Sequence, residues 1–239
     1  MSTDSESLVA RPGGPSDALV VGVPPHLYAR PLIEGLDREA RVRLERGETD
    51  VLAERFASGA LAAALLPPLD ALRHPGGRIM PGLAVCAPSD ARCERLLCRV
   101  PPQDVRTVAS TSRGAADRAR LVLADAFGVL PCLAQGKADA DAVAVSGDDG
   151  LRGDDAWPYA DDLGRMWSAT TELPWVLAVW VTGPRAPIAE LRVILARAAQ
   201  AGSERREELA REAPERHGVS VEIARECLET AWRYRLASD

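Results

Sequence analysis

The stretch VRTVASTSRGAADRARLVLADAFG, from Val105 to Gly128, decides the expected fold. Its first part, Val105 to Ala109, is predicted to form a strand. Residues Arg113 to Phe127 then place apolar side chains at helical spacing. The hydroxyl residues between the two parts can turn the chain and cap the helix, and Gly128 is suited to end it. The stretch therefore predicts a strand that leads directly into a helix.

The rest of the chain repeats this alternation. Five more segments are predicted to form strands, and they are residues 18–23, 60–66, 95–100, 140–145 and 175–181. Helices are expected at residues 31–36, from residue 49 or 50 to 58, and beyond Pro187, where Ser220 can cap the last one. Strands that alternate with helices predict an α/β fold whose ligands bind at the carboxyl ends of the strands.

Two lobes with a ligand cleft between them are expected. They comprise residues 15–100 plus 179–239 for lobe 1 and residues 101–178 for lobe 2. Residues 1–14 are expected to be a disordered amino terminus. The Pro101-Pro102 pair marks a crossing between the lobes, and a cleft of this kind is a natural place for a small ligand.

The composition is that of an acidic globular chain of 239 residues, in which 29 basic and 35 acidic side chains give a net charge of −6. A nucleic-acid partner is not expected, because binding it requires a positive surface. The amino terminus lacks the pattern of a signal peptide, and no apolar run approaches the roughly 20 residues of a membrane helix. We therefore expect a cytoplasmic protein without a membrane partner. The five cysteines are expected to stay reduced, and no complete metal-ligand pattern is present.

The turn that begins the helix after Ala109 is the best candidate for a binding site. Thr111, Ser112 and Arg113 bring backbone N–H groups, hydroxyls and the helix dipole together, which suits a carboxylate or a phosphate. The alternative is that a hydroxyl only caps the helix and that Arg113 faces solvent.

Two other residues follow predicted strands and are expected at the same cleft. Asp148, after Gly147, is suited to act as a general acid or base or to bind a hydroxyl, unless it only forms a turn. Tyr28 is suited to donate a hydrogen bond to a ligand, unless it is an ordinary loop aromatic.

Taken together, these segments resemble the chorismate dehydratase family of the futalosine route to menaquinone, which has the two-lobed type II periplasmic-binding-protein fold. The similarity runs over most of the chain and rests on the order and spacing of short motifs. The motifs are Leu27-Tyr28-Ala29-Arg30-Pro31-Leu32, Ala64-Leu65-Leu66-Pro67, Gly82-Leu83-Ala84, Val100-Pro101, Thr111-Ser112-Arg113, Ala140-Asp141-Ala142 with Gly147-Asp148, Asp162-Leu163-Gly164, Trp167, Thr171, Leu173-Pro174, Ala178-Val179-Trp180 and Arg233-Tyr234-Arg235-Leu236.

The resemblance implies a hydro-lyase of menaquinone biosynthesis that removes water from chorismate to give 3-[(1-carboxyvinyl)oxy]benzoate. Its site residues are then Tyr28 and Asp148 as catalytic groups, and Thr111, Ser112, Arg113, Cys93 and Gly147 as substrate-binding groups. The implied partner is the small-molecule substrate, chorismate, with no metal or organic cofactor, and the protein is expected to be a monomer or a homodimer.

The chain departs from the family at several pocket positions. Tyr28 stands where the family has Asn, Pro68 replaces a Ser, and Gly114-Ala115 replace a Thr-Ser pair. Core motifs are kept better than pocket motifs. This pattern also fits a second hypothesis, a non-catalytic small-carboxylate-binding or sensor protein with the same fold.

Overall fold

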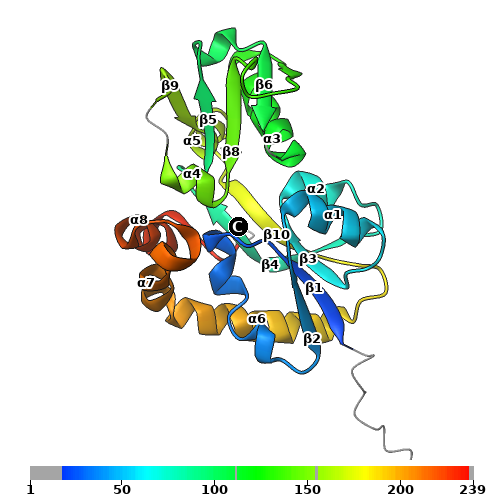
Figure 1. Ribbon diagram of the computed structural model, residues 1–239. Coiled ribbons are helices and arrows are strands. Elements are labelled where there is room, and N and C mark those ends of the chain that lie inside the picture. Colours follow the sequence, from blue (N-terminus) through cyan, green and yellow to red (C-terminus); the bar gives the residue numbers. More distant parts are fainter. Residues whose placement is uncertain (1–17, 111, 154–155, 237–239) are drawn as a thin grey trace, which may run out of the picture.

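The computed structural model describes residues 18–110, 112–153 and 156–236. In this part the chain forms two lobes, each built around a five-stranded sheet with helices packed against it (Figure 1). The predicted two-lobed α/β fold is thus confirmed. The expected disordered amino terminus, residues 1–14, lies outside the described residues, and so does Thr111.

Lobe 1 contains a mixed sheet in the order β2-β1-β3-β10-β4. Its strands are β1 (Leu19–Val23), β2 (Val42–Arg46), β3 (Ala63–Leu66), β4 (Arg78–Ala87) and β10 (Trp175–Thr182). β1 runs parallel to β2 and β3, whereas β10 runs antiparallel to β3 and β4. The central strands β3 and β10 are almost entirely apolar because both of their faces are buried.

Helices cover this sheet and fill the space beside it (Figure 1). They are the 3-10 helices η2 (Leu27–Leu32) and η3 (Leu36–Arg38), the α-helices α1 (Thr49–Ala57), α2 (Pro68–Leu72), α6 (Ile188–Glu204), α7 (Arg206–His217) and α8 (Val221–Arg225), and the π-helix η5 (Glu226–Ala231). The helix expected at 31–36 forms earlier in the chain, as η2. It does not extend to residue 36, because Gly35 has a left-handed backbone conformation with a φ of 77°. Ser220 caps α8 as predicted, since its Oγ accepts a hydrogen bond from the Ile223 N–H at 3.3 Å.

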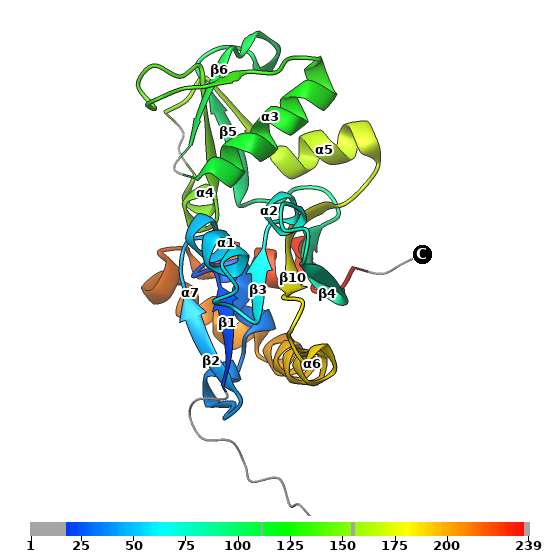
Figure 2. The same ribbon diagram turned by 90° about the vertical axis from the view of Figure 1, so that its right-hand side faces the viewer.

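Lobe 2 contains the second sheet, in the order β7-β6-β8-β5-β9. Its elements are β5 (Glu94–Cys98), the 3-10 helix η4 (Pro102–Asp104), β6 (Thr107–Ser110), α3 (Arg113–Phe127), β7 (Cys132–Leu133), β8 (Ala142–Ser146), α4 (Asp148–Arg152), β9 (Tyr159–Asp162) and α5 (Leu163–Thr171). Figure 2 shows α3 and α5 lying together against one face of this sheet. The helix predicted from Arg113 to Phe127 is confirmed at both ends.

The sheets correct the lobe boundaries that the sequence predicts. β5 pairs with β8 and β9, so residues 94–98 belong to lobe 2 and not to lobe 1. Residues 175–178 pair with β4 and belong to lobe 1. The apolar pattern of a strand does not reveal which sheet the strand joins, whereas the register of its backbone hydrogen bonds does. Within the described ranges, no helix is long and apolar enough to span a membrane.

Close packing of α6 against η2 generates a prediction about Gly202. A Cβ atom at this position would lie 2.1 Å from the Pro31 carbonyl oxygen. Gly→Ala normally favours a helix, but here the backbone of η2 blocks the added methyl group. Gly202→Ala is expected to lower the free energy of unfolding by about 2 kcal/mol in urea denaturation. Ser203→Ala, at the next and exposed position, is the matched control and is expected to be neutral. An unchanged stability for Gly202→Ala would contradict this packing.

Candidate functional site

The predicted site residues gather where the two lobes face each other. Tyr28 lies on η2, just after β1 ends, and Ser112 and Arg113 begin α3 after β6. Gly147 and Asp148 follow β8 and begin α4. Carboxyl ends of strands from both sheets therefore supply the site, as the alternating pattern predicts.

The start of α3 holds a carboxylate, and this carboxylate comes from the protein itself. The Arg113 N–H donates to Asp50 Oδ2 at 3.0 Å, and the Ser112 hydroxyl donates to Asp50 Oδ1 at 3.2 Å. Asp50 lies on α1 of lobe 1, so this contact joins the two lobes. Ser112 also caps α3 by accepting a hydrogen bond from the Ala115 N–H. The predicted anion-binding helix start is present, and Asp50 occupies it.

The side chain of Arg113 contributes little to this contact. It is 79 % exposed, and its nearest carboxylate is Asp117, 4.0 Å away on the same helix. The contribution of Arg113 to the contact with Asp50 is its backbone N–H. The predicted contribution of Thr111 lies outside the described residues.

Tyr28 is only 4 % exposed and sits at the centre of this region. Its ring meets the Trp232 ring edge-on, with the ring centroids 6.3 Å apart. Burial, together with the nearby Cys93 thiol and Glu94 carboxylate, raises the pKa of Tyr28 well above its ordinary value. The phenol therefore stays neutral and can donate a hydrogen bond. Burial also raises the pKa of Cys93, so this thiol is protonated and a poor nucleophile.

A buried ion pair, which the sequence did not single out, lies close to Tyr28. Arg118 on α3 and Glu94 on β5 are 5 % and 3 % exposed. Arg118 Nε and Nη2 donate to the two oxygens of Glu94, at 3.1 and 2.9 Å. A sequence signal for this pair exists, because Arg118 interrupts the apolar face of α3 that Ala115, Ala119 and Val122 form. An arginine at a core position requires a buried partner.

Two polar atoms at this point make no hydrogen bond within the described part of the chain. They are Arg118 Nη1 and Asp70 Oδ2, the latter from α2 of lobe 1. A Cβ on Gly114 would lie 2.8 Å from Asp70 Oδ2 and 3.3 Å from Arg118 Nη1, so both atoms surround the same small space. Burial raises the pKa of Asp70, although Arg118 and Arg73 act in the opposite direction. Orphaned buried atoms of this kind point to a water or a ligand group as their partner.

Asp148 joins α4 of lobe 2 to two elements of lobe 1. Its Oδ1 accepts from the Leu27 N–H at 2.8 Å, and its Oδ2 lies 2.7 Å from Nδ1 of His217. Gly147 is required beside it, because its φ is 68° and a Cβ would lie 2.5 Å from the His26 ring. Burial lowers the pKa of His26, with Asp148 opposing the shift. His217 is a site residue that the sequence patterns did not identify.

Side chains fill the face between the lobes in this closed arrangement. Cys93 is fully buried beside Tyr28, and the Glu94–Arg118 pair closes the space behind it. A cavity of about 670 Å³ lies elsewhere, at the opposite end of lobe 1, and a smaller one of about 420 Å³ is lined in part by Arg30 and His217. Among the described residues, no group of three His, Cys, Asp or Glu side chains is placed to hold a metal ion. A ligand that used the donors at the start of α3 would have to displace Asp50.

Comparisons with known proteins agree with this architecture. A family model described as menaquinone biosynthesis matches residues 19–238. No curated protein sequence matches the chain. The crystal structure of protein AF1704 from Archaeoglobus fulgidus superposes with a TM-score of 0.72 at 14% identity, over 94% of this chain and 93% of that one.

Periplasmic-binding-protein structures are also similar. The Candida albicans CA3427 gene product, described as having the generic periplasmic binding protein fold, gives a TM-score of 0.56 at 14% identity, over 91% of this chain and 81% of that one. The aliphatic sulphonate binding protein SsuA from Escherichia coli gives 0.54 at 12% identity, over 91% and 85%. At these identities the likeness shows the fold alone, a two-lobed periplasmic-binding-protein-like fold.

The environment of Asp70 predicts a pH-dependent stability. An acid whose pKa is raised by folding contributes stability below its ordinary pKa of 3.8, and this contribution is lost as the pH rises through the raised value. Asp70→Asn removes this loss, since the amide is neutral throughout. The variant is expected to gain stability relative to the wild type, on the order of 1 kcal/mol, between about pH 4 and about pH 7.

The measurement is urea denaturation of the wild type and of Asp70→Asn at about pH 4 and about pH 7. The quantity compared is the change in the free energy of unfolding between the two pH values. Asp104→Asn, an exposed aspartate of lobe 2, is the control and is expected to show a smaller change. An equal pH response of Asp70→Asn and the wild type would show that Asp70 is not strained by burial.

Proposed function

Because the chain belongs to the menaquinone biosynthesis family, we propose that it is a chorismate dehydratase. The reaction removes water from chorismate to give 3-[(1-carboxyvinyl)oxy]benzoate. Membership of the family supports a role in menaquinone biosynthesis. The observation that carries the specific proposal is the carboxylate already bound at the start of α3.

The contact with Asp50 supports a role for this helix start in binding a substrate carboxylate. A backbone N–H and a hydroxyl converge there, and the dipole of a 15-residue helix favours negative charge. Chorismate carries two carboxylates, and one of them would replace Asp50 when the lobes open. The exchange replaces one carboxylate by another, so the donors of α3 are satisfied in both states.

Arg118 Nη1 and Asp70 Oδ2 provide the next recognition groups in this proposal. Arg118 is held by Glu94 and keeps an unused donor for the second carboxylate of chorismate. Asp70, whose pKa is raised, is suited to hydrogen-bond the substrate hydroxyl from the opposite lobe. Both residues, Asp70 and Arg118, are buried, at 4 % and 5 % exposure, which favours a fixed orientation of the substrate.

The elimination requires loss of a ring proton and departure of hydroxide, which leaves as water once protonated. In our proposal Asp148 takes the ring proton. A carboxylate has about four lone-pair positions, and the bonds to Leu27 and His217 occupy two of them. Tyr28, as a neutral phenol, donates a hydrogen bond to the leaving hydroxyl. Aromatisation of the ring drives the reaction, so binding and orientation supply most of the catalysis.

A second candidate function is that of a protein that binds a small carboxylate but catalyses no reaction. Tyr28 favours it, because this bulky, fully packed phenol stands where the family has the smaller Asn. A small-carboxylate binder or sensor would use the same helix start and would omit the proton transfers. In either case we propose a cytoplasmic monomer or homodimer, with a small molecule as its partner and no nucleic acid or membrane.

The assay for the first function is formation of the aromatic enol ether from chorismate, followed by liquid chromatography. The wild type is expected to form product. Ser112→Ala is expected to lower kcat/KM about tenfold or more, because it removes a donor to the substrate carboxylate. Arg113→Ala is the matched control and is expected to stay within about twofold, because its backbone N–H remains.

Each other result has a defined meaning. Stabilisation of the protein by chorismate without product would support the binder instead of the enzyme. Neither product nor stabilisation would overturn both proposals.

Asp50→Asn tests whether the protein's own carboxylate competes with the substrate. The amide keeps the shape of Asp50 but lacks the charge that the start of α3 attracts. The variant is expected to bind chorismate several-fold more tightly in isothermal titration calorimetry and to lose about 1 kcal/mol of stability. Glu54→Gln, an exposed change on the same helix, controls for the altered net charge. Weaker binding by Asp50→Asn would mean that Asp50 supports the site and does not compete for it.

A further inference from the structure

We propose that lobe 1 contains a second ligand site, which binds a small aromatic carboxylate at the end of the sheet opposite the site between the lobes. A cavity of about 670 Å³ opens there beside the first residues of β1. Tyr28 follows the other end of the same strand. The two sites are therefore separated by the length of the sheet.

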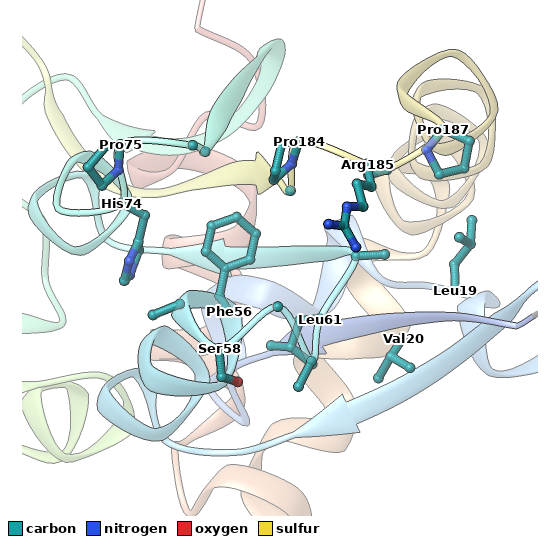
Figure 3. Close-up of a pocket in the computed structure, with 18 of the residues that line it drawn as sticks. Leu19, Val20, Phe56, Ser58, Leu61, His74, Pro75, Pro184, Arg185 and Pro187 are labelled. Atoms are coloured by element: carbon teal, nitrogen blue, oxygen red, sulfur yellow. The ribbon is translucent and has the colours of Figure 1, made fainter.

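Three loops surround this cavity. They are residues 58–62 after α1, residues 74–77 after α2 and residues 183–187 after β10, and the last residues of α1, Phe56 and Ala57, also line the cavity. The volume lies within the roughly 300–1000 Å³ range of small-molecule pockets. The proline residues Pro75, Pro184 and Pro187 stand at its rim and limit the freedom of two of the loops (Figure 3).

The walls of the cavity are mostly apolar. Leu19, Leu61 and Phe56 contribute side chains, and the Phe56 ring meets His74 edge-on with centroids 5.4 Å apart. Figure 3 shows the Phe56 ring standing between His74 and Arg185. An aromatic or aliphatic ligand body fits such walls, and an aromatic one adds ring contacts with Phe56.

The charged residues that line the cavity favour an anionic ligand. The chain has 35 acidic residues and a net charge of −6, yet none of the residues that line the cavity is Asp or Glu. Arg185 supplies the positive charge, and within the described part of the chain it has neither an ion pair nor a hydrogen bond. Its side chain reaches from beside Pro184 toward Leu61 (Figure 3). A planar guanidinium without a partner matches a carboxylate, which it can bind through two parallel hydrogen bonds.

His74 also lines the cavity. Its Nε2 is buried and makes no hydrogen bond to any described residue. This atom has almost no surface that water reaches, so a ligand in the cavity does not contact it in this structure. In Figure 3 His74 and Arg185 lie on either side of Phe56. The ligand class that fits Arg185 and the apolar walls is therefore an aromatic monocarboxylate.

The experiment is a titration of the full chain with 4-hydroxybenzoate by isothermal titration calorimetry. Binding is expected, and Arg185→Met is expected to raise Kd about tenfold, because the methionine keeps the apolar stem and loses the charge. Arg106→Met, an exposed arginine of lobe 2, is the matched control and is expected to leave Kd unchanged. The neutral analogue 4-hydroxybenzamide is expected to bind about as weakly to the wild type as the carboxylate binds to Arg185→Met.

A second variant separates this site from the one between the lobes. Ser112→Ala alters the start of α3 and is expected to leave the affinity for 4-hydroxybenzoate unchanged. Loss of binding in Ser112→Ala, equal binding by the two arginine variants, or no binding to the wild type would overturn the proposal. Because Arg185 is exposed and unpaired, its replacement is expected to leave the thermal unfolding midpoint unchanged, which confirms that a change in Kd is local.

Discussion

Carboxylates join the lobes of this protein, and two of them, Asp50 and Asp148, lie at the candidate site with their donors on the opposite lobe. Asp50 of lobe 1 accepts hydrogen bonds from the start of α3, and Asp148 of lobe 2 accepts from Leu27 and pairs with His217. The Asp50 contact uses donors at the start of α3, where the helix dipole favours negative charge. Any ligand between the lobes must therefore compete with side chains of the protein.

The buried ion pair between Glu94 and Arg118 lies next to these contacts and has one hydrogen-bond donor left over. Glu94 binds Arg118 through two donors, and burial raises the pKa of Glu94 while Arg118 opposes the shift. The pair satisfies most of its own hydrogen bonds but leaves Arg118 Nη1 unused. An arrangement that served stability alone would satisfy this donor or replace the pair by apolar groups. The unused donor of Arg118 and the buried carboxylate of Asp70 are the groups through which our proposed ligand site would affect stability.

The architecture was largely predictable from local patterns. The strand, cap and helix from Val105 to Gly128 are confirmed because propensity, capping and apolar spacing agree with one another there. The lobe boundary near residue 100 was misplaced, because β5 carries the same kind of apolar pattern as the strands of lobe 1. Strands with charged or alternating residues, such as β2 and β9, gave little signal in the sequence.

The sequence alone determined the two-lobed α/β class, the caps at Ser112 and Ser220, and a helix start suited to an anion, because each of these depends on neighbouring residues. Only the tertiary structure decided that Asp50 occupies that helix start and that Arg118 finds Glu94. It also decided that Asp148 bonds to His217, 69 residues away. These pairs join segments whose separation along the chain carries no periodicity or motif. Their partners are fixed by how the sheets and lobes pack, and that packing is a property of the whole fold.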